Sequence, residues 1–357
     1  MEEYLEINEI MKNLYDYILF YIPSIKNYIE YIDSLSKKVL ERVALYYLEN
    51  DVMPFQNDDF LEMDITDKIN LLIEFYKDKG VLFNPSNPFL DGAIDIECRS
   101  FDDYNENGRF KEGYNRYIDN HKSIDIYDHG ILLDSVTWLH ELTHYRNQRD
   151  GERSEEGKIF TEALSFTYEL FYLDYLKEKG YPIEDYYLDN LDGQAGYVKY
   201  FSPIISLFYT YCRFGEISIQ NFNNIYPHSN IEENEYLNYY KPNDFNFMIS
   251  YVLDRYHDSC CREEFFRSSL VGIMYSFALP LQIYIYDKYK NDASYFDRVE
   301  KLVSTVNDLS FEDCMRTLNI TYPFTDKFLY ELELSTDKYM EQIGDYVKVL
   351  EYQKRSK

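Results

Sequence analysis

Apolar residues recur at helical spacing along most of this chain, and they alternate with polar residues in only two short segments. Helical spacing begins near Glu2, returns at about Ser135, and extends into a last helix that starts near Asp326. The alternating segments, 93–99 and 123–127, are typical of half-buried strands. The sequence therefore predicts a mainly α-helical fold with a small β-sheet placed before the central helices.

Turn-forming residues suggest one internal boundary. The stretch from Gly80 to Gly92 contains Pro85 and Pro88 and lacks helical periodicity. We therefore expect residues 1–80 to form an N-terminal helical lobe and residues 81–357 to form a second unit with a cleft. Within that unit the periodicity predicts helices at 135–148, 159–179, 198–213, 245–256, 263–290 and 293–307.

The charge of the chain restricts its partners. It carries 64 Asp and Glu against 36 Lys and Arg, which gives a formal net charge of −28. Such a surface repels nucleic-acid phosphates and anionic lipid, so we expect neither nucleic acid nor a membrane as partner. Cationic peptides would be attracted.

The ends and the cysteines suggest a cytoplasmic protein. The first residues, Met1-Glu2-Glu3-Tyr4-Leu5-Glu6, are acidic, whereas a signal peptide needs a basic flank and an apolar stretch. We expect no apolar run that approaches the roughly 18 residues of a membrane span. The five cysteines lack CxxC spacing, so they are expected to be reduced thiols.

The motif HExxH, at His140-Glu141-Leu142-Thr143-His144, carries the most specific chemistry in the sequence. Histidines at positions i and i+4 share one helix face, so both imidazoles can bind one Zn²⁺. Glu141 is then placed to take a proton from an attacking water rather than to bind the metal. Asp134 or Ser135 is a candidate N-cap for this helix.

A catalytic zinc needs a third protein ligand, and the next helix offers carboxylates. Glu162 is the preferred ligand, because an acidic side chain among Phe160 and Leu164 is costly unless it is paired or bound to metal. Glu169, two turns on, is predicted to accept a hydrogen bond from a ligand imidazole. Glu155 and Glu156 are expected to lie in the preceding loop as alternative ligands. His121, His129 and His228 have polar neighbours and are expected to be ordinary surface residues.

The reaction that this constellation predicts is amide hydrolysis. One zinc per chain would activate water, with Glu141 as the general base. The oxyanion that forms needs another donor, for which Tyr or His on a facing element is the usual choice.

The HExxH helix followed by Glu-Ala-x-Ser-x-x-x-Glu resembles the thimet oligopeptidase and oligoendopeptidase F family of zinc peptidases. The similarity covers roughly residues 90–345, from the first strand to Leu318-Asn319-Ile320, and includes the stretch 272–278 around Tyr275. It implies His140, His144 and Glu162 as zinc ligands and Glu141 as base. It also implies Tyr275 as oxyanion donor, a two-lobed zincin-type fold with a channel, and oligopeptide substrates in the cytoplasm.

Four features depart from the family pattern. Only 17 residues separate His144 from Glu162, and Thr143 stands where the family commonly has glycine. Around Tyr275 the usual further tyrosines and preceding histidine are missing, and the lead-in lobe is short. Two alternatives to an oligopeptidase therefore remain: a dedicated processing or effector protease for one protein, and an inactive peptide-binding relative.

Overall fold

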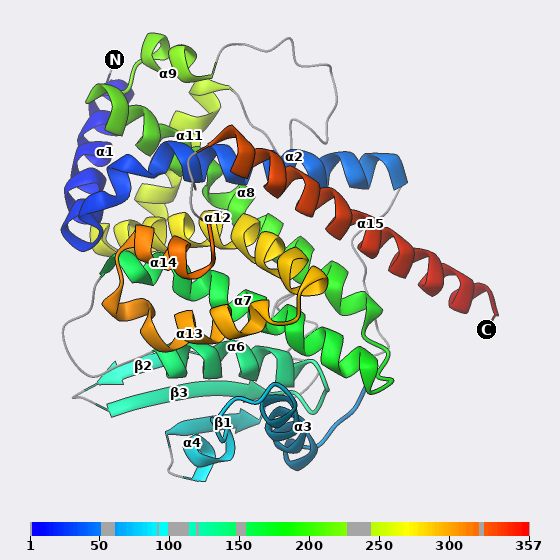
Figure 1. Cartoon of the computed structure of the whole chain (residues 1–357). Coiled ribbons are helices and arrows are strands. Elements are labelled where there is room, and N and C mark those ends of the chain that lie inside the picture. Colours follow the sequence, from blue (N-terminus) through cyan, green and yellow to red (C-terminus); the bar gives the residue numbers. More distant parts are fainter. Residues whose placement is uncertain are drawn as a thin grey trace.

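The chain is helical over most of its length. The computed structural model describes residues 2–50, 61–90, 93–98, 114–118, 121–147, 155–226, 244–320 and 325–356. The prediction of a mainly α fold with a small sheet before the HExxH helix is confirmed (Figure 1). The longer helices are α1 (Glu2–Tyr21), α2 (Ile29–Asn50), α3 (Ile65–Asp78), α6 (Asp134–Asn147), α7 (Glu155–Glu178), α8 (Glu184–Phe214), α11 (Phe245–Asp258), α12 (Arg262–Asn291), α13 (Tyr295–Thr305) and α15 (Asp326–Ser356). Short helices are α4 (Ser86–Leu90), α9 (Ile219–Ile225) and α14 (Phe311–Thr317), with 3-10 turns at Pro23–Asn27 and Val306–Asp308.

The sheet has three strands in the order β1-β3-β2. β1 (Ile94–Cys98) runs parallel to β3 (His121–Asp128), and both lie where alternation predicted strands. β2 (Tyr114–Ile118) pairs antiparallel with β3 and was not predicted. It is only five residues long, and alternation does not distinguish it.

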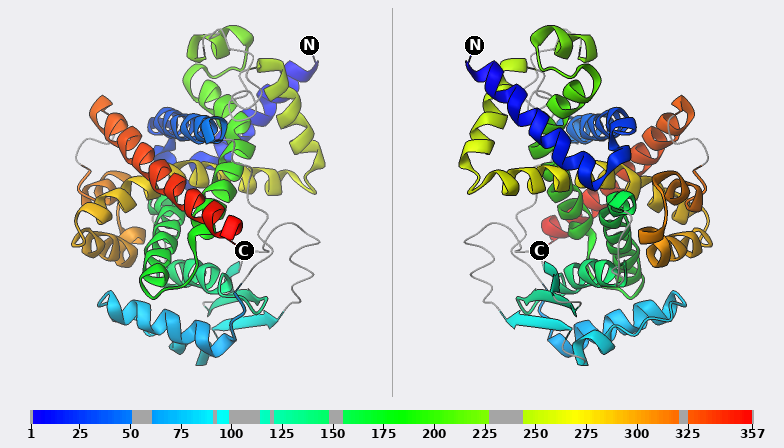
Figure 2. Two further views of the ribbon diagram at one scale, coloured as in Figure 1. Left: turned by 90° about the vertical axis from the view of Figure 1, so that its right-hand side faces the viewer. Right: turned by 90° about the vertical axis from the view of Figure 1, so that its left-hand side faces the viewer.

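Helices α6 and α7 stack on this sheet in two layers. Figure 1 shows the sheet at one end of the molecule, α6 next to it, and α7 on the far side of α6. Figure 2 shows from two sides that α3 also lies at the sheet end, whereas α1, α9 and α11 lie at the opposite end. Within the segment predicted as an N-terminal lobe, α1 and α2 pack against α8 and α12, while α3 packs against α6. The boundary at residue 80 stays a prediction.

Aromatic rings fill the contacts between α7, α8 and α12. Phe160 of α7 packs edge-on against Phe277 of α12, with ring centroids 5.1 Å apart. At Gly272 of α12 a Cβ atom would come within 2.3 Å of the Phe201 ring, so only glycine lets α12 and α8 approach this closely. The large aromatic content of the sequence is thus used in the core.

Helix α8 is longer than its predicted range of 198–213. It begins at Glu184 and includes Pro203. Gly193, Gly196 and Pro203 weaken the local helix signal, because glycine and proline are poor helix formers. Buried Leu191, Ala195 and Val198 supply the compensating packing.

Helix α12 corrects one expectation. It carries an 18-residue window with a mean hydropathy of 1.4, so it is long and apolar enough to cross a membrane. The expectation that no run approaches this length was wrong. However, 72% of that window is buried within the protein, against α7, α8, α2 and α15. It therefore packs as a core helix.

Candidate metal centre

A buried cluster of charged side chains holds the start of α6 in position. Lys68 of α3 pairs with Asp128 at the end of β3 and, at 2.6 Å, with Asp134 at the first position of α6. The carboxylate of Asp134 also accepts hydrogen bonds from the backbone N–H groups of His129 and Ile131 at 3.0 Å. Gly130, with φ of 78°, makes the turn between strand and helix. Asp134 was predicted as a candidate N-cap of α6. Its carboxylate instead binds backbone N–H groups of the turn before the helix.

His129 belongs to this cluster, so its prediction as a surface residue was wrong. Its side chain is 6% exposed, and its Nδ1 lies 2.9 Å from Asp134 Oδ1. Burial would raise the pKa of the Asp134 carboxyl. The hydrogen bond from His129 and the charge of Lys68 outweigh burial, and the pKa is lowered.

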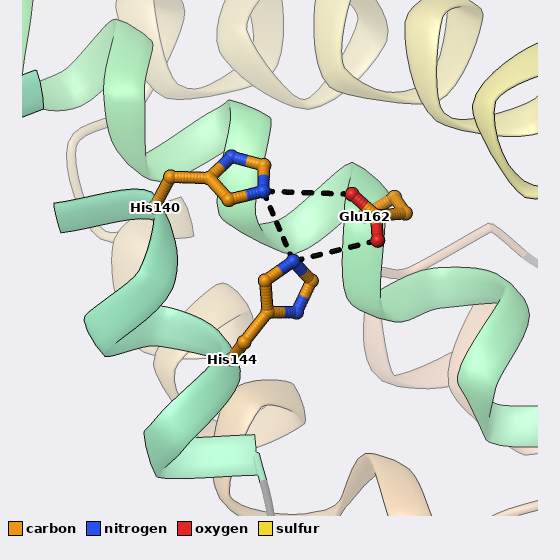
Figure 3. A group of neighbouring side chains, drawn as sticks. All are labelled: His140, His144 and Glu162. Carbon is orange, nitrogen blue, oxygen red and sulfur yellow. Dashed lines mark hydrogen bonds and ion pairs between the residues drawn. The ribbon is translucent and has the colours of Figure 1, made fainter. Parts of the chain in front are cut away.

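The side chains of His140 and His144 leave the same face of α6 and point at Glu162 of α7 (Figure 3). Helical spacing brings the two imidazoles together, and the packing of α6 on α7 brings the carboxylate to them. Glu162 sits beside buried Phe160, Ala163 and Leu164, as its sequence neighbours suggested. One donor atom from each of the three residues lies within 4.8 Å of the others.

The two distances from imidazole to carboxylate match the edges of a metal coordination sphere, and the distance between the two imidazole nitrogens is shorter. His140 Nε2 lies 3.0 Å from His144 Nε2 and 3.5 Å from Glu162 Oε2. His144 Nε2 lies 3.4 Å from Glu162 Oε1. Ligand atoms about 2.0–2.2 Å from a tetrahedral zinc lie roughly 3.3–3.6 Å from one another. The three donors are thus arranged around a point between them.

One buried oxygen atom of Glu162 lacks a hydrogen-bond partner, which is also consistent with a metal at this point. Glu162 Oε2 is buried and has no hydrogen-bond partner, because 3.5 Å to His140 is too long for a good hydrogen bond. A buried carboxylate oxygen without a partner is costly. Two imidazole nitrogens and one carboxylate form a donor set that zinc prefers. The residues present therefore fit a zinc ion.

The electrostatics of the site also favour a bound cation. Burial would lower the pKa of His140, but the carboxylates of Glu162 and Glu169 raise it well above its ordinary value. Burial would raise the pKa of Glu162, but His144 and His140 lower it below its ordinary range. Both shifts have one cause, which is that the buried carboxylates attract positive charge to this point.

Glu169 holds one of the ligand imidazoles. Its Oε1 lies 2.5 Å from His140 Nδ1, and its Oε2 accepts a hydrogen bond from the amide of Asn190 on α8. With its proton on Nδ1, His140 turns the lone pair of Nε2 towards His144 and Glu162. Glu169 thus contacts one of the two imidazoles, and its role in orienting a metal ligand stays a prediction. Asn190 was missed, because no local signal distinguishes it among the residues of α8.

Of the two predicted catalytic residues, one follows His140 in α6 and the other lies behind the Phe166 ring. Glu141 of α6 is buried, with 5% of its surface exposed. Tyr275 of α12 is half-buried and stacks on Tyr197 of α8, with ring centroids 4.9 Å apart. Its ring also contacts Phe166 at 5.5 Å, and Phe166 contacts the His140 ring at 4.8 Å. Their roles stay predictions.

The other candidates from the sequence lie wholly or partly outside the described residues. Glu155 and Glu156 were predicted to lie in a loop, but they are the first two residues of α7. Their side chains lie outside the described residues. His121 begins β3, although its side chain is likewise not described, and His228 lies outside the described ranges. Among the described residues, the trio of His140, His144 and Glu162 is the group of metal-binding type that the structure brings together.

Comparison of whole folds identifies the architecture. A crystal structure described as "a putative oligoendopeptidase F from Bacillus anthracis str. Ames" superimposes with a TM-score of 0.51 at 15% sequence identity. The chain has the fold of oligoendopeptidase F. A 3.1 Å X-ray structure described as a "putative Oligoendopeptidase F" matches with a TM-score of 0.50 at 13% identity. This agrees with the predicted fold class, which is mainly α with a small β-sheet before the HExxH helix.

The similarity is confined to the fold and to part of those proteins. Each match covers 93% of this chain but 57% and 59% of the matched chains, so this chain spans less than three fifths of their length. No protein-family profile and no curated protein sequence matches the chain.

Proposed function

We propose that this chain is a zinc-dependent metalloendopeptidase that hydrolyses peptide bonds in oligopeptides. The observation that carries the proposal is the convergence of His140, His144 and Glu162 from two helices, next to the intact Glu141. The oligoendopeptidase F fold gives these helices a peptidase-like setting. Glu169, whose Oε1 lies 2.5 Å from His140 Nδ1, supports the same assignment.

The chemistry divides between one zinc ion and the side chains of this chain. Zinc, when bound by His140, His144 and Glu162, supplies a Lewis acid that lets water lose a proton near neutral pH. The carboxylate of Glu141 takes that proton and later delivers it to the leaving amine nitrogen. Glu169 keeps the His140 proton on Nδ1 throughout.

Tyr275 is the proposed donor to the oxyanion that forms on the substrate carbonyl. Its hydroxyl can donate a hydrogen bond, and its ring is held by Tyr197 and Phe166. Loss of one oxyanion donor lowers kcat by about 10²–10³-fold. Tyr275→Phe should show such a loss with little change in zinc content. Tyr197→Phe, which keeps the stacked ring, should leave kcat nearly unchanged. Equal kcat for Tyr275→Phe and wild type would remove Tyr275 from the reaction.

The charge of the chain favours cationic peptides or basic segments of a protein as substrates, in the cytoplasm and without nucleic acid or membrane as partner. The net charge of −28 supports this choice, because long-range attraction raises the rate of encounter. A peptide series that differs only in charge should show kcat/KM rising with positive charge. The difference should shrink at high salt.

The decisive experiment is cleavage of a diverse quenched-peptide library by wild type, Glu141→Gln and the control Glu263→Gln. Glu263 lies exposed at the start of α12, so its substitution should change nothing. Zinc should be stoichiometric in all three proteins, with turnover lost by about 10²–10⁴-fold only in Glu141→Gln.

Other outcomes separate the alternatives. Zinc with no cleavage of any library peptide would redirect the proposal to a dedicated protease for one protein. Zinc with no turnover of any peptide or protein substrate would indicate an inactive peptide-binding relative. Absence of zinc from the wild type would overturn the proposal.

A further inference from the structure

A chain of three side-chain amides connects Glu169 of α7 to helix α12. Asn190 of α8 donates a hydrogen bond to Glu169 Oε2, and Gln194 Nε2 donates to Asn190 Oδ1 at 2.9 Å. Gln194 and Gln282 of α12 then exchange hydrogen bonds through both of their amide groups. Gln194 is 4% exposed and Gln282 is fully buried. We propose that Asn190, Gln194 and Gln282 are positioning residues that hold Glu169 against His140. This inference rests on the proposed zinc function, and we call the three residues the amide relay.

The direction of the hydrogen bonds supports this role. From Gln194 onwards the hydrogen bonds run in one direction: Gln194 donates to Asn190, and Asn190 donates to the carboxylate of Glu169. Glu169 therefore accepts from Asn190 on one oxygen and faces His140 Nδ1 with the other, at 2.5 Å. A carboxylate held at both oxygens cannot rotate away from the imidazole without losing a buried hydrogen bond.

The relay follows one face of α8. Asn190, Gln194 and Tyr197 are spaced i, i+4 and i+7, so they lie in a row along the helix. Tyr197 stacks on Tyr275 of α12. Gln282, the last residue of the relay, lies seven residues after Tyr275 on the same helix. The same two helices therefore hold both the Glu169 carboxylate and the Tyr275 ring.

Burial makes the geometry of the relay specific. An amide without a hydrogen-bond partner in the core costs about 1–3 kcal/mol, so amides survive there only when they are paired. The reciprocal pairing of Gln194 with Gln282 satisfies both ends and leaves one Gln194 proton for Asn190. An apolar pair would pack in the same space, so packing alone does not require these residue types.

The test compares the zinc affinity of relay variants with that of a matched control. Asn190→Leu removes the donor to Glu169, and the double variant Gln194→Met/Gln282→Met removes the support behind Asn190. The control Tyr187→Phe/Tyr286→Phe removes hydrogen bonds from the same two helices to Asp174 of α7, at 2.6 and 2.8 Å. Competition with a chromogenic chelator measures zinc affinity, and thermal unfolding of the zinc-free proteins measures stability.

We expect Asn190→Leu to weaken zinc binding about tenfold, at the lower end of the 10–100-fold range for groups that orient metal ligands. The double glutamine variant should also weaken zinc binding, but by a smaller factor than Asn190→Leu. The tyrosine control should bind zinc as wild type does, even if its stability without zinc falls as much as that of the relay variants.

A double-mutant cycle separates positioning from general support. Because the relay acts through Glu169, Asn190→Leu should have no further effect on zinc affinity in a Glu169→Met background. Additive losses in that cycle, or unchanged zinc affinity in both relay variants, would overturn the inference while leaving the proposed function intact. A wild-type protein that binds no zinc would instead overturn the proposed function itself.

Discussion

Two buried clusters of charged side chains share helix α6, and they are completed in different ways. Near the middle of the helix, His140, His144 and Glu162 bring three donor atoms within 4.8 Å of one another. At its start, Lys68 lies between Asp128 and Asp134, with His129 beside Asp134. Each cluster places carboxylates in a low-dielectric interior, where an unpaired charge is costly.

The difference lies in where the positive charge comes from. Lys68 is fully buried, and its ammonium group contacts both carboxylates, so the chain itself completes that cluster. At the candidate metal centre, no lysine or arginine ion pair to Glu162 occurs in the described part of the chain, and Glu162 Oε2 is left without a hydrogen bond. One cluster is closed and structural, whereas the other has a place for a cation from solution.

The largest effect is expected from breaking the closed cluster. Lys68→Met leaves Asp128 and Asp134 buried without their ammonium partner, which should lower the free energy of unfolding by about 3–5 kcal/mol. Urea unfolding measures the loss. Lys327→Met, at a largely exposed lysine, should stay within about 0.5 kcal/mol of wild type. If Lys68→Met unfolds like wild type, the cluster does not hold α6 in place.

The metal centre should respond to zinc, and the Lys68 cluster should not. Free zinc at about 100 times its Kd should raise the free energy of unfolding by about 2.7 kcal/mol. Glu162→Gln removes a ligand charge, so most of that increase should disappear. Glu263→Gln, on the exposed start of α12, is the control and should keep it in full. Equal stabilisation of Glu162→Gln and wild type would exclude Glu162 as a ligand.

The smallest effect concerns pH. The pKa of Asp134 is lowered in the folded chain, so its charge stabilises the fold at pH above roughly 3.9, the ordinary value for Asp. That stabilisation is lost as the pH falls through the lower, folded-state pKa. The difference in unfolding free energy between wild type and Asp134→Asn should thus be constant from pH 7 to 5 and shrink below about pH 4. A difference that persists unchanged at pH 3 would contradict the assigned pairing.

Local patterns predicted much of the architecture. The helix 135–148 appears as Asp134–Asn147, and the helix predicted from Asp326 begins at that residue. Both results follow from periodicity, which is a property of neighbouring residues. Strand β2 and the first half of α8 escaped prediction, because a hairpin partner and buried packing stabilise them against weak local preference.

Within the candidate site, the sequence by itself determined that His140 and His144 face the same point, because residues four apart on a helix must do so. It also limited the third donor to a few carboxylates on the following segment. Only the tertiary structure decided that Glu162 reaches the pair, that Asn190 supports Glu169, and that Lys68 completes the cluster at the start of α6. These contacts join residues on different helices, and their geometry depends on how whole elements pack, which no local pattern encodes.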